Sequence, residues 1–210
     1  MFKIFEIAAN IFLIINFILF LFRFNKENKA FKIYTIYLGV IVAVQISLKT
    51  FIHFGYENLI LSHVYFCGQF ILLSLFYLEL LKEKYQKQII KWNLGITMTV
   101  VIISFLVTPA SLFNYNPIEI LFTSITLIVY STFHFYNMLS SKKEFYYVNC
   151  GILIYLFGST VTFLPRNLQY KFDDSFDYIL QNLNIVLYNV YLIFIFIEWF
   201  KFNSKKINEK

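Results

Sequence analysis

The chain has 210 residues, of which 59% are hydrophobic, 21% are aromatic and only 14% are charged, with a formal net charge of +6. A water-soluble domain carries roughly a quarter charged residues, and its interior is too small to hide so much apolar surface. These values exclude a water-soluble enzyme and a disordered chain, and they predict an integral membrane protein.

Seven apolar segments are long enough to cross a bilayer as helices, which takes roughly 20 residues each. The segments are continuously apolar and do not alternate with a period of two, so helices are favoured over the strands of a barrel. We therefore predict an all-α, polytopic fold: one seven-transmembrane-helix bundle that forms a single domain over residues 1–210. The predicted spans are residues 4–22, 33–54, 59–81, 92–108, 118–139, 146–164 and 178–200.

Basic residues predict how the bundle is oriented. Most of the 18 Lys and Arg residues lie after the first, third, fifth and seventh spans, at Arg23, Lys26, Lys29, Lys32, Lys82, Lys84, Lys87, Lys91, Lys142, Lys143, Lys201, Lys205, Lys206 and Lys210. Positive residues stay on the cytoplasmic side, which predicts an N-terminus outside and a cytoplasmic C-terminus in the cell inner (plasma) membrane. These residues flank spans and form no patch, so we expect contact with the lipid bilayer and not with nucleic acid.

Polar side chains within the spans are candidate site residues because burying them in a bilayer is costly. The candidate ligand-binding residues, all in the outer half, are Gln45, Lys49, His53, His63, Glu119 and Asn182. We expect an outward-opening pocket between the second, third, fifth and seventh spans, in which Lys49 is neutralised by Glu119 or Glu6. In the alternative, Lys49 extends to the outer interface and His53 and His63 lie among lipid headgroups.

A polar stripe follows one face of the fifth span, with members three or four residues apart. Its members are Thr123, Thr126, Tyr130 and His134. The stripe would act either as a relay from the pocket or as a set of hydrogen bonds between helices. In the sixth span, Gly151 and Gly158 are seven residues apart on one face, which predicts a close contact with another helix.

The sequence gives little support for catalysis. The seventh span has no lysine at its middle that could form a Schiff base with retinal. A zinc site needs about three converging ligands, but His53 and His63 are expected at the outer side and His134 at the inner side. Cys67 shares a face with His63, yet the sequence places no acid beside them for nucleophilic catalysis. We therefore predict no enzyme activity, no cofactor and no metal site.

Three segments resemble a known group of proteins. They are His63-Val-Tyr-Phe-Cys-Gly-Gln-Phe with the later Phe76-Tyr-Leu-Glu-Leu-Leu, then Tyr147-Val-Asn-Cys-Gly, and finally Leu187-Tyr-Asn-Val-Tyr. They are similar to small seven-helix bacterial membrane proteins of unknown function, often encoded next to two-component sensor histidine kinases. The resemblance implies a stand-alone sensory or partner-binding module with no catalytic residues.

These observations predict a receptor-like sensory or partner-regulating membrane module. A ligand would bind in the outer half, and small helix shifts would act on an unidentified cytoplasmic protein partner through the basic connectors. One alternative is a small-solute transporter or pore, because seven spans can arise as two parallel three-helix repeats around a linker helix. Another is a membrane accessory protein of a bacterial defence system.

Overall fold

The computed structural model describes residues 2–114, 116–140, 143–167 and 174–208. Within these ranges the chain folds into α-helices and two short 3-10 helices, with no strand, which confirms the all-α class. The α-helices are α1 (Phe2–Leu21), α2 (Lys29–His53), α3 (Leu59–Leu80), α4 (Lys84–Val107), α5 (Pro117–Met138), α6 (Tyr146–Asn167) and α7 (Asp174–Asn208). The 3-10 helices are η1 (Phe24–Lys26) and η2 (Pro109–Phe113).

All seven α-helices are long and apolar enough to cross a membrane. Large apolar side chains are exposed along the bundle, for example Leu106 and Val107 on α4 and Phe157 on α6. Water-soluble proteins rarely expose apolar surface on this scale, whereas lipid chains cover it readily. The chain therefore has the architecture of a multi-pass membrane protein.

Several helices are longer than the predicted spans. α2 begins at Lys29 instead of residue 33, because Oδ1 of Asn28 caps the helix by accepting a hydrogen bond from the Phe31 amide at 2.9 Å. α4 begins at Lys84 instead of residue 92, and its first turn is held by paired amide hydrogen bonds between Gln86 and Asn137, at 3.1 and 2.7 Å. Hydropathy locates the apolar part of a helix but not the polar turns that continue it.

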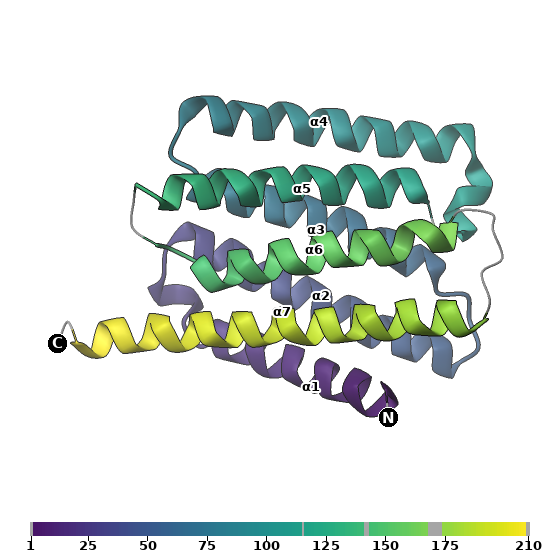
Figure 1. Ribbon diagram of the computed structural model, residues 1–210, viewed down its shortest axis with the longest axis horizontal. Coiled ribbons are helices and arrows are strands. Elements are labelled where there is room, and N and C mark those ends of the chain that lie inside the picture. The colour runs from purple at the N-terminus through teal and green to yellow at the C-terminus, as the bar shows by residue number, and fades with distance from the viewer. Residues whose placement is uncertain (1, 115, 141–142, 168–173, 209–210) are drawn as a thin grey trace.

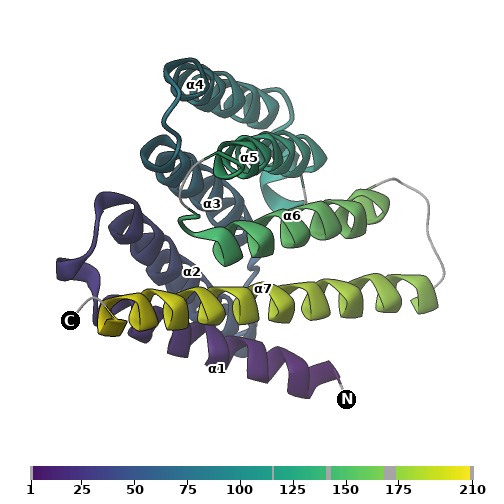
Figure 2. The same ribbon diagram turned by 60° about the vertical axis from the view of Figure 1, so that its left-hand side comes forward.

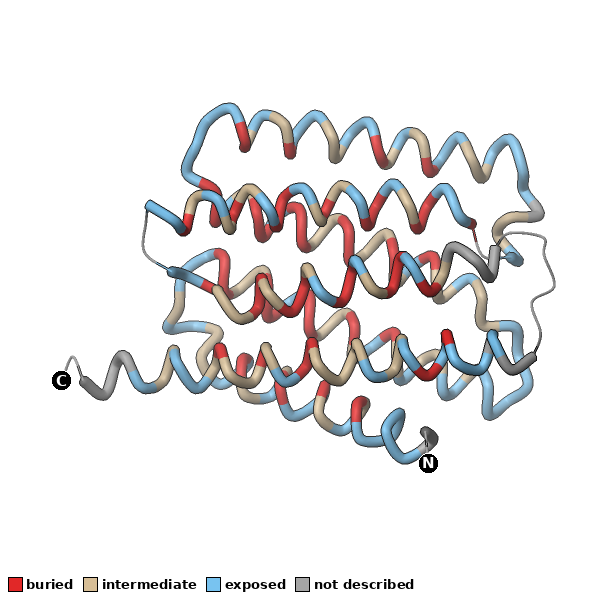
Figure 3. The backbone as a smooth tube through the Cα atoms, viewed as in Figure 1, coloured by how far each residue is buried: buried red, intermediate tan, exposed pale blue. Residues whose placement is uncertain are grey.

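Six of the helices form a closed ring, and α4 lies outside it. Around the ring, α1 packs on α2, α2 on α3, α3 on α5, α5 on α6, α6 on α7, and α7 returns to α1. α4 contacts only the outer side of this ring, through α5 and α3, and Figures 1 and 2 show it as the outermost helix. Figure 3 shows that buried residues gather on the inward faces of the ring helices.

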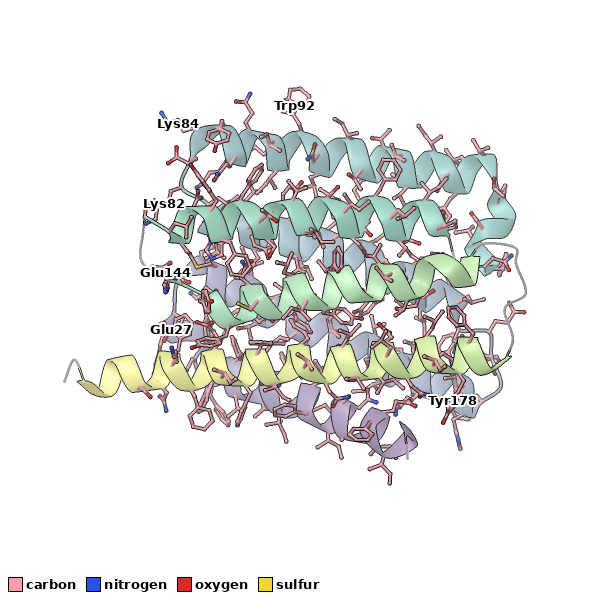
Figure 4. The ribbon with its side chains drawn as sticks, in the orientation of Figure 1. Glu27, Lys82, Lys84, Trp92, Glu144 and Tyr178 are labelled. Carbon is pink, nitrogen blue, oxygen red and sulfur yellow. The ribbon has the colours of Figure 1, made fainter. Side chains whose placement is uncertain are left out.

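Each helix runs in the opposite direction to the helix before it in the chain, so the bundle has two distinct ends (Figure 1). We call the end where α1, α3, α5 and α7 begin the N-terminal end, and the opposite one the C-terminal end. Figure 4 places Lys82, Lys84 and Glu144 at the C-terminal end and Tyr178 at the N-terminal end. The basic connectors therefore share one end as far as they are described; Lys142 and Lys210 lie outside the described residues.

Aromatic side chains fill the ring toward the C-terminal end. Phe20, Phe31, Phe76 and Phe145 are all completely buried there. The rings of Phe20 and Phe31 stack at 4.8 Å between centroids, and Phe145 meets Phe76 edge-to-face at 5.1 Å. Such pairs pack without polar atoms. This aromatic plug closes the centre of the bundle at that end.

The contact between α6 and α7 is close because of the two glycines on α6. A Cβ atom added to Gly151 would lie 2.9 Å from a ring carbon of Tyr191 and 3.0 Å from Cβ of Phe194. One added to Gly158 would lie 2.4 Å from a methyl group of Leu187. The predicted close helix contact is confirmed.

Candidate functional site

A cavity of about 230 Å³ lies in the half of the ring nearer the N-terminal end. Residues of α1, α2, α3, α6 and α7 line it, and no residue of α5 does. Its polar lining includes Glu6 and Asn10 from α1, Gln45 from α2, Ser62 from α3 and Asn184 from α7. Because the Glu6 side chain is 54% exposed, the cavity reaches the surface there.

Aromatic rings form much of the remaining cavity wall. They belong to Tyr65 and Phe66 on α3, Tyr155 and Phe163 on α6, and Tyr188 on α7. The rings of Tyr155 and Tyr188 have their centroids 5.5 Å apart, and Phe66 meets Phe163 edge-to-face at 5.8 Å. The wall is therefore a continuous aromatic surface contributed by three helices.

A hydrogen-bonded group of tyrosines adjoins this wall at the centre of the ring. The Tyr191 hydroxyl lies 2.8 Å from that of Tyr34 and donates to that of Tyr37 at 3.3 Å. Nε2 of Gln69 donates to the Tyr37 hydroxyl at 3.2 Å. The ring of Tyr191 also stacks on Tyr155 of the cavity wall, with centroids 5.5 Å apart and planes 13° apart. We call these residues, with Tyr65, the tyrosine network; it joins α2, α3, α6 and α7.

The two halves of the ring contribute matching tyrosine pairs to this network. Tyr37 of α2 meets Tyr191 of α7, and Tyr155 of α6 meets Tyr65 of α3 with 3.2 Å between the hydroxyls. Tyr37 and Tyr155 each stand in an Ile-Tyr-Leu triplet, and Tyr65 and Tyr191 each follow a valine. Exchanging α1–α3 for α5–α7 also leaves the order of contacts around the ring unchanged. The ring thus has an approximate two-fold relation between two three-helix halves, with α4 as the linker outside.

Two residues that line the cavity have unmet hydrogen-bonding capacity. Oδ1 of Asn184 and the hydroxyl of Tyr188 are buried and have no hydrogen-bond partner within the described part of the chain. A buried polar atom without a partner costs about 1–3 kcal/mol. The cavity is therefore bordered by groups whose hydrogen bonds a bound molecule could complete after small side-chain rearrangements.

An ion pair lies at the surface beside the cavity. Nζ of Lys49 is 3.6 Å from Oε1 of Glu6, and both side chains are about half exposed. Lys49 lines a second, smaller cavity, which shares Asn10 and Gln45 with the first. Of the two acids expected to neutralise Lys49, the structure provides Glu6. The other, Glu119, lies against α3.

Glu119 is fully buried and forms a separate cluster with two side chains of α3, the buried His63 and the half-buried Cys67. Its Oε2 lies 2.5 Å from Nδ1 of His63, and its Oε1 accepts a hydrogen bond from Sγ of Cys67 at 3.2 Å. Asn116 caps α5 immediately before it, and the ring of Phe105 packs edge-on against His63. His63 is only 6% exposed, so the expectation that it lies among lipid headgroups is wrong. The carboxylate clamps α3 to α5.

The arrangement of this cluster does not support nucleophilic catalysis. An activated cysteine needs its thiol bonded to the imidazole, whereas the Cys67 thiol donates to the Glu119 carboxylate. No group of three or more His, Cys, Asp and Glu side chains in the described residues is arranged to hold a metal ion. The acid beside His63 and Cys67 is Glu119. The sequence did not reveal this contact because Glu119 lies 52 residues after Cys67, on another helix.

The remaining candidate ligand-binding residues occupy different places. Gln45 lines both cavities. His53 is exposed at the end of α2, with its ring against Phe54 at 5.4 Å. Asn182 is buried on α7 but is not part of either lining. The structure thus brings Gln45 and Lys49 together and leaves His53 and Asn182 outside the site.

Two members of the polar stripe on α5, Tyr130 and His134, make contacts that hold α5 to neighbouring segments. Thr123 donates to the Glu119 carbonyl in its own helix at 2.7 Å, and Tyr130 donates to the Ile90 carbonyl of α4 at 3.5 Å. Nε2 of His134 lies 2.8 Å from the Glu144 carbonyl before α6, and Thr126 is half-buried. Within the described residues no hydrogen bond joins one stripe member to the next. The stripe therefore packs α5 against its neighbours and forms no continuous relay.

Sequence reasoning missed the aromatic and amide residues of the cavity, chiefly Tyr65, Tyr155, Asn184 and Tyr188. The signal that could have found two of them is the repeated Ile-Tyr-Leu and Val-Tyr pattern of the two halves. Comparison with protein-family models, with curated proteins and with solved structures gives no significant match for this chain.

Proposed function

We propose that this protein is a receptor-like sensory membrane module, which binds a small molecule in the cavity and regulates a cytoplasmic protein partner. One observation carries the proposal: the cavity reaches the surface near the N-terminal end and is bordered inside by the tyrosine network. A molecule that touches Tyr65 or Tyr155 therefore touches a hydrogen-bonded group shared by four helices. Another cavity, of about 560 Å³, lies at the C-terminal end, but none of its lining residues belongs to the tyrosine network.

The network offers a route for a small helix shift. Displacement of Tyr155 by a ligand would alter its hydroxyl contact with Tyr65 and its ring stack on Tyr191. Tyr191 lies on α7, which extends past the other helices at the C-terminal end (Figure 1). A ligand shifts such an equilibrium only if it binds the two arrangements with different affinity. In the proposed mechanism α7 carries the response to the partner.

The proposed orientation has the N-terminus outside and the C-terminus in the cytoplasm of a bacterial cell, in the inner membrane. It is supported by the shared end of the basic connectors, since Lys and Arg are retained on the cytoplasmic side. The cavity would then open to the outside and the end of α7 would face the cytoplasmic partner.

Transport of a small solute is a second candidate, favoured by the two-fold relation of the ring. Transporters built from two parallel three-helix repeats bind their substrate at the interface between the repeats. Here residues of both halves line the cavity, and α4 lies outside as a linker would. The aromatic plug would then be the closed gate of one state.

A screen followed by flux measurement tests both candidates. The unfolding temperature of the purified protein is measured with each member of a library of small metabolites. Each compound that raises it is then measured in the same way with Ser62→Phe, a variant whose larger side chain fills the cavity. Each compound that depends on the cavity is then offered to proteoliposomes. A receptor gives ligand-dependent changes in disulfide cross-linking between cysteines placed on α2 and α7, with no uptake above empty vesicles. Saturable uptake supports transport instead. If no compound prefers the wild type to Ser62→Phe, ligand binding in this cavity is refuted.

A further inference from the structure

The lining of the cavity has a charge pattern that selects one class of ligand. Among the described residues, the only charged side chain in the lining is Glu6; no lysine, arginine or histidine takes part. The remaining polar groups are amides and hydroxyls, and the rest of the wall is aromatic and aliphatic. A bound anion would therefore meet a carboxylate and no positive charge.

The aromatic wall adds to this preference. Aromatic rings carry negative charge on their faces and attract ammonium groups, and the attraction grows where water is excluded. Five rings line the cavity, from Tyr65, Phe66, Tyr155, Phe163 and Tyr188. An amine also carries N–H donors, and Oδ1 of Asn184 is a buried acceptor with no partner in the described residues. From these features we infer that the ligand is a small organic cation: an amine attached to an apolar body.

Lys49 explains how Glu6 is held when no ligand is bound. Its ammonium group lies 3.6 Å from the Glu6 carboxylate, beside the cavity and not in its lining. Both side chains are about half exposed, and an exposed pair of this kind contributes little to stability. The ammonium of the ligand takes the place of Lys49, whose flexible side chain turns toward water.

The size of the cavity limits the ligand. An engineered protein cavity of about 150 Å³ binds benzene. By that measure the cavity of about 230 Å³ holds roughly nine or ten non-hydrogen atoms. 2-Phenylethylamine has this size and places an ammonium group two carbons from an aromatic ring. It is the probe of choice, although the physiological ligand need not be aromatic.

The inference rests on the proposed ligand-binding function, and matched probes separate the two. Binding to the purified, full-length protein is measured by titration calorimetry with 2-phenylethylamine, with neutral 2-phenylethanol and with anionic 3-phenylpropionate. We expect the amine to bind most tightly and the anion least. If the alcohol or the anion binds as tightly as the amine, and Ser62→Phe abolishes that binding, the cation inference is wrong while the cavity remains a ligand site. If none of the probes binds at millimolar concentration, the cation inference is also wrong, and the metabolite screen decides the proposed function separately.

Three variants test the role assigned to Glu6. Glu6→Gln should weaken the binding of 2-phenylethylamine by about tenfold or more and leave the binding of 2-phenylethanol unchanged. Lys49→Met should strengthen amine binding by about two- to fivefold, because the competing cation is removed. Glu79→Gln is the matched control: it removes an exposed ion pair with Lys29 at the other end of the bundle and should change nothing. An unchanged amine affinity in Glu6→Gln, or a weakened one in Lys49→Met, overturns the inference.

Discussion

Two polar clusters lie inside this bundle, and they differ in whether their side chains line the cavity that reaches Glu6. Both carboxylate oxygens of Glu119 have a partner, whereas Nε2 of His63 has none in the described residues, and none of the three side chains lines the cavity that reaches Glu6. Beside the cavity, Asn184 and Tyr188 each keep a buried polar atom without a partner in the described residues. A carboxylate paired away from the cavity stabilises the fold, whereas an unpaired polar atom next to the cavity can gain a hydrogen bond from a ligand. The comparison favours a structural role for the contact of α3 with α5 and supports the binding role proposed for the cavity, which α3 also lines through Ser62, Tyr65 and Phe66.

The largest expected effect is the loss of the Glu119 carboxylate. Glu119→Ala leaves the buried His63 and the half-buried Cys67 without their shared acceptor, and removing one partner of a buried pair costs about 3–5 kcal/mol. Thermal and denaturant unfolding of the purified protein measure the loss. Glu57→Ala, in the exposed connector between α2 and α3, is the control and should leave stability unchanged. Equal stability of the two variants would show that the buried cluster is not a clamp.

A smaller loss is expected where α6 and α7 approach each other closely. Gly151→Ala places a methyl group 2.9 Å from the Tyr191 ring and 3.0 Å from Cβ of Phe194, and overpacking of this kind costs about 1–3 kcal/mol. Gly95→Ala on α4 meets no atom within 4 Å, so it should be neutral or stabilising, because alanine favours a helix over glycine. The difference between the two unfolding temperatures checks the prediction, which fails if both variants change equally.

The tyrosine network allows the contrast between satisfied and unsatisfied groups to be tested on α7 itself. Tyr191→Phe removes a hydroxyl bonded to Tyr34 and Tyr37, which should cost about 1 kcal/mol. Tyr188→Phe removes a buried hydroxyl that has no partner in the described chain, so it should be neutral or stabilising. Both changes delete a single oxygen, so packing is nearly constant. A loss in Tyr188→Phe as large as in Tyr191→Phe would contradict the distinction.

The smallest effect on stability is expected at the cavity rim. Lys49→Met breaks an exposed ion pair with Glu6, which contributes less than about 1 kcal/mol. We therefore expect the unfolding temperature to stay near that of the wild type, even though the same variant should alter amine binding. A large loss of stability would place Lys49 in the structural part of the bundle and not at the rim of a binding site.

The seven spans could be predicted because hydropathy is a property of consecutive residues. Hydropathy does not predict the polar ends of the helices. Asn28 caps α2 and Gln86 holds the first turn of α4, each through a side-chain hydrogen bond that does not affect average hydropathy. For the candidate site, Gln45 and Lys49 were found from their spacing on one helix. The partner of Lys49 remained open between Glu6 and Glu119, because residue spacing within one helix does not identify the helix opposite.

By itself, the sequence determined that this is a membrane protein with seven apolar helices and a close glycine contact on α6, since segment hydropathy and residue size are local properties. Tertiary structure alone decided which polar groups meet. It joined Glu119 to His63 and Cys67, placed Glu6 beside Lys49, and bordered the cavity with α1 and α6 instead of α5. The physical reason is that all seven helices are apolar enough to cross a membrane, so their order around the ring depends on how particular side chains pack and on which polar groups find partners.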